Sequence, residues 1–521
     1  MTQDPLASIP QPGVLEHGVS QPNTKLFSGA EALTFDDVLI VPGWSEVLPS
    51  EVSTATTIAG IELALPLLSA AMDTVTEAPL AIALAREGGI GILHRNMTIM
   101  EQADQVDRVK RSQAGMITAP VSLGPTATLA DAEQIMSRHS ISGVPITDDE
   151  DRLVGILTNR DIRFCTEAEY DQPVTAFMTS RNLVTAPVGT SLEEAVLTLH
   201  EHRIEKLPLV DEQGRLRGLI TVKDIRKRIQ KPDSSLDLEG RLRVGAAIGV
   251  SDAIDRAEAL ANAGVDLLVI DTAHGHSKGV IDTVADVKQK WPEIMVVGGN
   301  VVTREGVEAL VRAGADAIKV GVGAGSICTT RIVAGAGMPQ LSAIYECARA
   351  AAPLGVPVIA DGGIVTSGDI VKAFAAGAAA VMLGNALAGV DEAPGDLELV
   401  DGSMWKTYRG MGSAGAMRGR AADRYGAGQD AGRPGAGRPG AGRPGGLGKH
   451  VAEGIEARVR YAGSLSKLVD QLAGGLRSGM GYAGASDLNQ LRTATRLVRV
   501  TGAGLRESHP HDVQVLNDQG L

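Results

Sequence analysis

Short runs of apolar residues recur along the chain, separated by segments in which apolar residues return every three or four positions. Such runs are typical of buried parallel strands, and the segments between them are typical of helices that cover a sheet. Eight strands that alternate with helices predict an α/β fold, the (β/α)8 or TIM barrel. The eight runs are residues 65–70, 89–94, 243–250, 265–272, 294–301, 317–323, 356–363 and 379–385.

The alternation stops between the second and third runs, where an internal repeat begins. Residues 129–163 align without a gap on residues 192–226, and each copy has the pattern of a helix, a strand, a charged turn, a strand and a helix. A duplicated unit of this size predicts one pseudo-symmetric module, here inserted in a barrel loop. The repeat resembles a tandem pair of CBS domains.

A CBS pair implies a nucleotide such as ATP or GTP between the two repeats. The residues expected to face it are Thr158, Asp161, Thr221 and Asp224. The alternative is that each aspartate only caps a helix, and both roles are compatible.

These patterns divide the chain into three parts. Residues 1–111 hold an N-terminal arm and the first part of the barrel, residues 112–231 the CBS pair, and residues 232–521 the remainder of the barrel. Gly, Ala, Arg and Pro dominate residues 418–448, which cannot bury a core. We therefore expect a mobile flap over the active site at about residues 405–460, followed by a C-terminal tail.

Composition narrows the function. A net charge of −13 argues against nucleic acid as the main partner, because phosphate neutralisation needs a basic surface. The three cysteines have neither metal-site nor disulfide spacing, and no apolar run is long enough to cross a membrane. A cytoplasmic protein is the expectation.

The sixth run leads into a loop with glycine at 321, 323 and 325, and this loop leads to Cys328. A thiol beside such a loop can act as a nucleophile, although an inert buried cysteine is the simpler alternative. Active sites of (β/α)8 barrels lie at the C-terminal ends of the strands. Polar residues gather there in this sequence, which favours the nucleophile: Asp271, Asn300, Cys328, Asp361 and Asn385.

Four segments together resemble inosine-5′-monophosphate (IMP) dehydrogenase of the bacterial type, which also carries a CBS insertion. They are residues 69–77 (SAAMDTVTE), 325–331 (GSICTTR), 361–363 (DGG) and 408–413 (YRGMGS). The resemblance covers nearly the whole chain. It implies NAD-dependent oxidation of IMP to xanthosine monophosphate (XMP), a committed step of guanine nucleotide synthesis.

The resemblance also implies the roles of the catalytic residues. Cys328 would add to C2 of the purine, and the thioimidate left after hydride transfer to NAD⁺ would be hydrolysed. Arg424 with Tyr425 would act as the base on the flap, with Thr330 near the attacking water.

The binding residues are expectations of the same kind. NAD⁺ would meet Asp271, Asn300 and Gly321, and K⁺ would bind at Gly323, Gly325 and Cys328 together with Glu507, Ser508 and His509 of a neighbouring subunit. Such a shared ion implies a homotetramer. IMP would be bound by Met72, Ser326, Asp361, Gly363, Gly384, Asn385, Tyr408, Gly410, Met411, Gly412 and Glu453.

Two alternatives remain open. A GMP reductase-like enzyme would share the barrel and the cysteine but generally lacks the Arg-Tyr pair. A CBS-based nucleotide sensor with an inactive barrel would not need Cys328. Three departures from the family pattern, Ala324, Asn385 and Gly426, and the AGRPG repeats bear mostly on closure of the flap.

Overall fold

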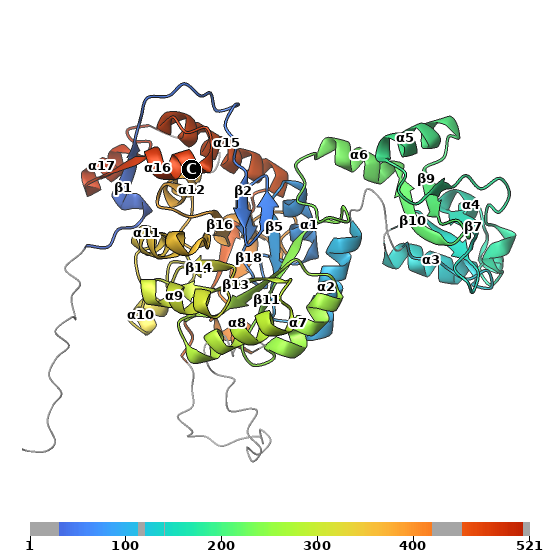
Figure 1. The fold of residues 1–521 in the computed structure, drawn as a ribbon, viewed down its shortest axis with the longest axis horizontal. Helices are drawn as coiled ribbons and strands as arrows, with labels where there is room; N and C mark the ends of the chain where they lie inside the picture. The colour runs from blue at the N-terminus through green and yellow to red at the C-terminus, as the bar shows by residue number, and fades with distance from the viewer. Residues whose placement is uncertain (1–30, 113–119, 140, 419–450, 514–521) are drawn as a thin grey trace, which may run out of the picture. The chain divides into compact units, whose positions relative to one another are not determined.

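The computed structural model describes residues 31–112, 120–139, 141–418 and 451–513. Eight parallel strands close a barrel in the order β11-β12-β13-β14-β15-β16-β4-β5 (Figure 1). Each predicted apolar run contains one of them, so the predicted fold class is confirmed. The strands are β4 (Leu67–Ser69), β5 (Ile90–Leu93), β11 (Val244–Ile248), β12 (Leu267–Asp271), β13 (Met295–Val301), β14 (Ala317–Val320), β15 (Val358–Asp361) and β16 (Ala380–Leu383).

Helices surround the barrel and bury the outward-facing side chains of the strands in the main hydrophobic cluster. None of the helices in the described ranges is long and apolar enough to cross a membrane. The helices around the barrel are α1 (Ala78–Arg86), α2 (Ile99–Ser112), α7 (Ala253–Asn262), α8 (Lys278–Lys290), α9 (Arg304–Arg312), α11 (Gln340–Ala351), α12 (Ser367–Ala375) and α15 (Leu465–Ala483).

A second apolar cluster fills the inside of the barrel. Successive side chains of a strand point to opposite faces, so every second residue points inward. In β12, β14 and β15 the inward residues Val269, Ala317 and Ile359 belong to this cluster. Two positions further along, the same alternation turns the polar residues Asp271, Lys319 and Asp361 toward the inside at the C-terminal end.

A hairpin that the sequence pattern did not reveal closes the N-terminal end of the barrel. It consists of β2 (Thr56–Ile58) and β3 (Ile61–Leu63), which pair antiparallel. Ile58, Ile61 and Leu63 belong to the inner cluster, so the hairpin covers the barrel interior at its N-terminal end.

Two features near the active site differ from what the sequence pattern favours. Helical spacing of the apolar residues after Cys328 favours one helix to about residue 352, but α10 (Thr330–Val333) ends early and α11 begins only at Gln340. Gly335 and Gly337 with positive φ, and Pro339 before α11, explain the break. In addition, the ends of the expected flap region are strands: β18 (Ser403–Arg409) pairs with both β17 (Leu397–Val400) and β19 (Glu456–Arg460).

The remaining elements outside the repeat are short. Near the N-terminus, β1 (Val38–Val41) pairs with β20 (Arg496–Arg499). The others are η1 (Phe35–Asp37), η4 (Ala352–Leu354), α13 (Asn385–Ala388), α14 (Ala414–Met417), α16 (Leu488–Ala494) and α17 (Gly502–Glu507).

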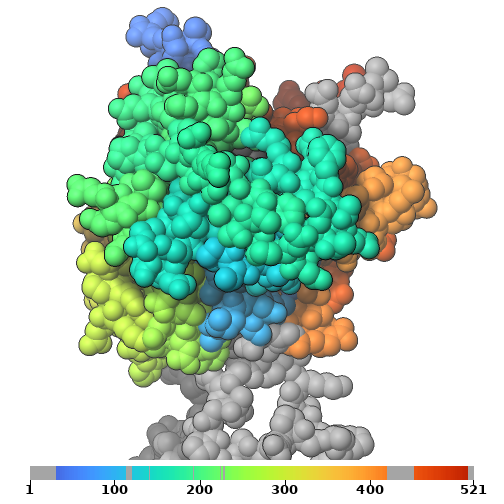
Figure 2. Space-filling view, turned by 90° about the vertical axis from the view of Figure 1, so that its right-hand side faces the viewer, coloured from blue at the N-terminus to red at the C-terminus, as the bar shows by residue number. Residues whose placement is uncertain are grey.

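The two repeats of residues 120–230 form a module of their own, coloured from cyan to green (Figure 2). Leu153 donates a backbone hydrogen bond to Gly214, and Leu216 donates the equivalent one to Asp151. This reciprocal exchange relates equivalent residues of the two copies, as a pseudo-symmetric module requires. Its elements are α3 (Leu129–Arg138), β6 (Gly143–Thr147), β7 (Leu153–Thr158), α4 (Asn159–Ile162), η2 (Glu167–Glu169), η3 (Val174–Ala176), β8 (Ala186–Pro187), α5 (Leu192–Glu201), β9 (Lys206–Val210), β10 (Leu216–Thr221) and α6 (Val222–Gln230).

Candidate active site

Cys328 lies on the loop between β14 and α10, at the C-terminal end of the barrel. The loop starts at Gly321, which has φ +145°, and a Cβ there would stand 2.0 Å from the carbonyl oxygen of Asp361. Only glycine fits such a close approach of two backbones. This close approach anchors the start of the loop to the end of β15. Cys328, further along the loop, is half-buried and so remains partly accessible.

A chain of hydrogen bonds leads away from the thiol. The hydroxyl of Thr330 donates to Oε2 of Glu453 at 2.7 Å, and Sγ of Cys328 lies 3.2 Å from the same hydroxyl oxygen. A hydroxyl has one proton to donate. Because that proton goes to Glu453, the thiol donates to Thr330, and the chain gives the cysteine proton a path toward a carboxylate.

Backbone pairing sets the position of Glu453. Thr329 donates to the carbonyl of Glu453 at 3.0 Å, and Ile455 donates to the carbonyl of Ile327 at 3.1 Å. The two segments thus run antiparallel, with Cys328 opposite Gly454. Glu453 was expected to line the purine. The structure places its carboxylate on Thr330, within reach of the cysteine.

Residues expected to bind the nucleotide come together around Tyr408, at the end of β18. Its hydroxyl oxygen lies 3.9 Å from Sδ of Met72, and a Cβ at Gly384 would stand 3.2 Å from it. Burial raises the pKa of the Tyr408 phenol to about 12, against the opposing effect of its hydrogen bond with Ser326. The phenol therefore stays protonated at neutral pH and can donate a hydrogen bond.

The neighbouring turn approaches the same place. Glu453 donates its backbone N–H to Gly412 at 3.1 Å, Gly410 donates to Ile455 at 3.0 Å, and Met411 packs against Met72. Gly363 follows β15 with φ +78°, and Asn385 opens the short helix α13 beside Gly384. Small residues and helix N–H groups at this end of the barrel suit a phosphate.

The polar residues at the ends of β12, β13 and β15 meet on one side chain that the sequence analysis missed. Lys319 of β14 donates to Asp271 at 2.8 Å, to Asp361 at 2.7 Å and to Asn300. Lys319 is 1% exposed. The available signal was a lysine at an inward position of an otherwise apolar strand, Ala-Ile-Lys-Val.

Comparison with known proteins identifies the family of the chain. A family model described as "IMP dehydrogenase / GMP reductase domain" matches residues 32–511. The chain belongs to this family. It is 55% identical to the inosine-5′-monophosphate dehydrogenase of Aquifex aeolicus, over 94% of this chain and 97% of that protein. It is 53% identical to the inosine-5′-monophosphate dehydrogenase of Bacillus subtilis, again over 94% of this chain and 97% of that protein.

Solved structures of the IMP dehydrogenase/GMP reductase family share the fold. A GMP reductase variant from Trypanosoma brucei, with one cysteine replaced by alanine and in complex with guanosine 5′-monophosphate, superposes with a TM-score of 0.83 at 41% identity, covering 93% of this chain and 98% of that chain. A second structure of the same GMP reductase variant gives a TM-score of 0.68 at 40% identity, over 92% of this chain and 98% of that chain.

Some expected site residues are not brought together in the described part of this family member. Glu507, Ser508 and His509, which were expected to reach the K⁺ site of a neighbouring subunit, lie at the exposed end of α17, where the side chains of Ser508 and His509 bond carbonyls of their own helix. That loop supplies the carbonyls of Gly323, Gly325 and Cys328, of which the Gly325 carbonyl already accepts from Cys328 N–H at 3.1 Å. Potassium stays a prediction. Arg424 and Tyr425 lie outside the described residues.

An ion pair that the sequence pattern did not reveal also stabilises the site. Arg409 binds Asp73 through Nε at 3.1 Å and Nη2 at 2.7 Å, and the amide of Asn96 donates to Asp73 at 2.7 Å. This ion pair joins the segment that carries Met72 to the strand that carries Tyr408. Both charges stand inside segments of the family resemblance, which was the available signal.

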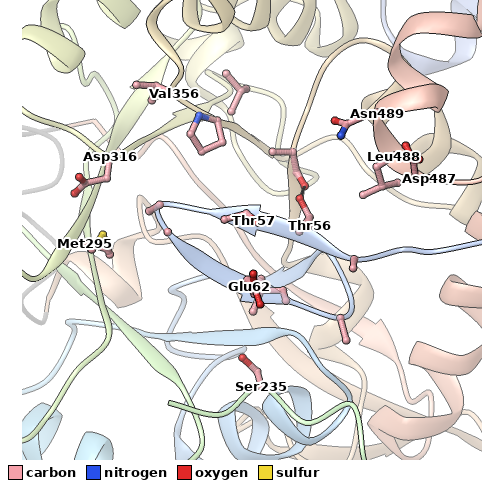
Figure 3. A pocket seen from close by; sticks show the side chains of 18 of the residues that line it. Thr56, Thr57, Glu62, Ser235, Met295, Asp316, Val356, Asp487, Leu488 and Asn489 are labelled. Atoms are coloured by element: carbon pink, nitrogen blue, oxygen red, sulfur yellow. Dashed lines mark hydrogen bonds between the residues drawn. The ribbon is translucent and has the colours of Figure 1, made fainter. Parts of the chain in front are cut away.

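A large cavity lies at the other end of the barrel. It measures about 1330 Å³ and surrounds the β2–β3 hairpin, with Thr56, Glu62, Ser235 and Asp316 among its lining residues (Figure 3). None of the expected catalytic or substrate-binding residues that the structure describes lines it. Cavity size therefore does not point to the candidate site.

Proposed function

We propose that this chain oxidises IMP to XMP with NAD⁺ through a covalent bond between Cys328 and C2 of the purine. The observation that carries the proposal is the hydrogen-bonded chain from Cys328 through Thr330 to Glu453 at the C-terminal end of the barrel. It occurs in a chain 53–55% identical to several IMP dehydrogenases over almost its full length.

The first half of the reaction adds the thiolate to C2. The thiol proton leaves toward Thr330 and Glu453, and the sulfur, now a better nucleophile, forms the C–S bond. NAD⁺, when bound, accepts the hydride that leaves C2. The sulfur keeps the carbon attached during this transfer, so the enzyme holds a thioimidate and the purine cannot diffuse away.

The second half breaks the C–S bond. Water adds to C2, loses its proton to a base and expels the Cys328 thiolate, which gives XMP. The resemblance assigns the base to Arg424 with Tyr425. Glu453 is a second proton acceptor within the described residues, because it already accepts from Thr330.

The resemblance also assigns each binding residue to a part of the ligands. Asp361 would take the ribose hydroxyls, and Ser326, Gly363, Gly384 and Asn385 the phosphate. Tyr408, Met72, Gly410, Met411 and Gly412 lie around the same position and would line the nucleotide. Asp271, Asn300 and Gly321 would meet NAD⁺. A homotetramer in the cytoplasm, with K⁺ shared between subunits through Glu507, Ser508 and His509, belongs to the same proposal.

The decisive experiment offers IMP with NAD⁺ and, separately, GMP with NADPH, and follows the absorbance of the reduced nicotinamide. We expect NADH from the first mixture and no consumption of NADPH in the second. The reverse result would favour a GMP reductase, which the Trypanosoma brucei structures make the main alternative. Leaving out K⁺ in the first mixture tests the ion.

A sensor with an inactive barrel is tested by the covalent bond itself. The protein is trapped with IMP and NAD⁺, digested, and its peptides are weighed. We expect a purine adduct on the peptide that contains Cys328. Without any adduct and without NADH, the enzymatic proposal fails.

The flap makes a separate prediction. With Arg424→Ala, one equivalent of NADH should still form rapidly, whereas XMP release should slow by about 10²-fold or more, because the base serves only the hydrolysis. Equal loss of the burst and of the steady-state rate would contradict this role.

For the repeat module we propose binding of ATP or GTP as a regulatory ligand. Thr158 donates to Asp161 through its backbone at 2.7 Å and its hydroxyl at 2.6 Å, which makes Asp161 the third residue of a capping box and not the N-cap itself. Titration of the full chain with each nucleotide by calorimetry tests the proposal.

A further inference from the structure

Lys319 occupies a position where a charged side chain needs a specific reason. It is one of the largest fully buried side chains of the protein, and it points into the barrel one layer above the apolar residues Ala317 and Ile359. Gly299 of the neighbouring strand leaves the space for it, because a Cβ there would stand 2.6 Å from Cβ of Lys319. An ammonium group this deep must be paired.

The three hydrogen bonds of Lys319 use the full capacity of an ammonium group. They reach Oδ1 of Asp271 at 2.8 Å, Oδ2 of Asp361 at 2.7 Å and Oδ1 of Asn300. The three acceptors stand at the ends of three different strands. One side chain thus connects β12, β13 and β15 at the end of the barrel where the candidate site lies.

The same contacts orient the amide of Asn300. Its oxygen accepts from Lys319, so its nitrogen faces the other way and donates to the carbonyl of Gly321 at 2.8 Å and to Oδ2 of Asp361 at 2.9 Å. Gly321 opens the cysteine loop. Lys319 therefore fixes the side-chain amide that contacts the first residue of the loop bearing Cys328.

The carboxylate of Asp361 is held on one oxygen only. Lys319 and Asn300 both donate to Oδ2, and in the described part of the chain no side chain donates to Oδ1. A carboxylate with one oxygen held and one available presents a defined acceptor to a ligand hydroxyl. Without the ammonium, Asp271 and Asp361 would repel each other, and one of them would turn away or take up a proton.

We propose that Lys319 is a positioning residue that fixes the residues expected to bind IMP relative to the residues expected to bind NAD⁺. It acts through Asp361, which would bind the ribose of IMP, and through Asp271 and Asn300, which would meet NAD⁺; in this respect the inference rests on the proposed function. All three N–H groups of Lys319 are taken up by these side chains, so it acts through them.

The chain offers a matched control at the other end of the barrel. Lys110 of α2 is 4% exposed and donates to Asp237 at 3.0 Å and to Asp266 at 2.6 Å. It is likewise a buried lysine between two aspartates, but none of these residues belongs to the candidate site. If breaking a buried ion pair were enough to reduce IMP affinity or the rate of NADH formation, replacing either lysine would have that effect.

The experiment compares Lys319→Met with Lys110→Met in the full-length protein. Urea unfolding measures the folded fraction of each variant. IMP affinity is measured without NAD⁺, and the rate of NADH formation is measured in a single turnover with IMP and with IMP deuterated at C2. Lys319→Gln, which keeps two N–H donors, is the second variant in case the methionine does not fold.

We expect Lys319→Met or Lys319→Gln to weaken IMP binding by about tenfold or more. The single turnover should slow further and show a larger isotope effect, because misplaced reactants slow the hydride-transfer step itself. Lys110→Met should stay within about twofold of wild type in both measurements, since it shares only the buried ion-pair chemistry.

IMP affinity and single-turnover rate for the Lys319 variants within about twofold of those of Lys110→Met would overturn the positioning role. That result, obtained with an active wild-type protein, leaves the proposed function intact. If the wild-type protein makes no NADH from IMP, the proposed function has failed on its own account.

Discussion

The two ends of the barrel bury charge in similar ways but differ in what surrounds it. At the C-terminal end, Lys319 and its partners lie beside the glycine loop, the thiol of Cys328 and the phenol of Tyr408. At the N-terminal end, Lys110 joins Asp237 and Asp266, and the β2–β3 hairpin covers the barrel interior. Among the described residues, only the C-terminal end combines its charges with a half-buried thiol that is hydrogen-bonded toward a carboxylate.

The two ends of the barrel also differ in how much empty space they enclose. The N-terminal end has the cavity of about 1330 Å³, but its acidic side chains Glu62, Asp316 and Asp487 lie at separate places around the hairpin (Figure 3). The site at the other end is recognised by groups within hydrogen-bond distance of one another. In this barrel, convergence of chemically suitable atoms indicates function better than empty space does.

The largest effect expected from breaking the comparison comes from Cys328→Ser. A serine hydroxyl cannot replace the thiolate as nucleophile near neutral pH, so turnover should fall by at least ~10⁴-fold. NADH formation measures this loss, and IMP affinity should change little because the substituted atom is one of many contacts. Cys165→Ser, in the repeat module, is the matched control and should leave turnover unchanged. A comparable loss in the control would remove Cys328 from the mechanism.

A smaller effect is expected at the end of the proton path. Glu453→Gln still accepts a hydrogen bond from Thr330 but no longer accepts a proton, so the steady-state rate should fall by about 10²-fold. Glu456→Gln is the control, because Glu456 lies exposed on β19 and its carboxylate accepts a hydrogen bond from the backbone N–H of Gly415, away from Cys328 and Thr330. Equal rates for the two variants would show that the Thr330–Glu453 bond does not move protons.

The eight strands and their helices could be predicted because each strand is an apolar run ended by polar or glycine residues. Local pattern sufficed there, since burial on both faces dictates the composition of a parallel strand. The β2–β3 hairpin and β17–β19 were missed for the opposite reason. Their strands are short or half-exposed, with alternating burial such as Glu456–Arg460, and so carry a weak signal.

The candidate site divides in the same way. Residues that end a strand, such as Cys328 and Asp361, could be placed from the sequence because the barrel brings strand ends together. The partners of Lys319, Gln340 and Arg409 could not be predicted, because they lie far along the chain. Gln340, for example, donates to the carbonyls of Val320 and Asp361. Long-range pairing of this kind leaves no local pattern.

At the N-terminal end we expect stability to change without activity. Lys110→Met leaves Asp237 and Asp266 without their shared cation, which should cost about 3–5 kcal/mol of the free energy of unfolding. Urea unfolding measures the loss, and turnover per folded molecule should stay at the wild-type level. A parallel loss of turnover would show that the two ends of the barrel are coupled.

The loss in Lys110→Met should also depend on pH. Burial raises the pKa of Asp266 above its ordinary value, and Lys110 opposes this rise. Without the lysine the folded-state pKa rises further. A raised folded-state pKa gives stability that is complete below the unfolded-state value and is lost as the pH rises through the folded-state value. The variant should therefore lose less stability, relative to wild type, in acid than at neutral pH.

The smallest effect is expected from Ser235→Ala, in the wall of the large cavity. The hydroxyl of Ser235 is buried and has no hydrogen-bond partner in the described residues, although its backbone bonds Ala85 and Arg243. A buried hydroxyl without a partner contributes no net stability, so its removal should change the free energy of unfolding by less than about 1 kcal/mol, in the stabilising direction if at all. Turnover should not change. A clear loss of stability would mean that the Ser235 hydroxyl is hydrogen-bonded in solution. A clear loss of turnover would mean that the cavity contributes to catalysis, and the contrast between the two ends would no longer hold.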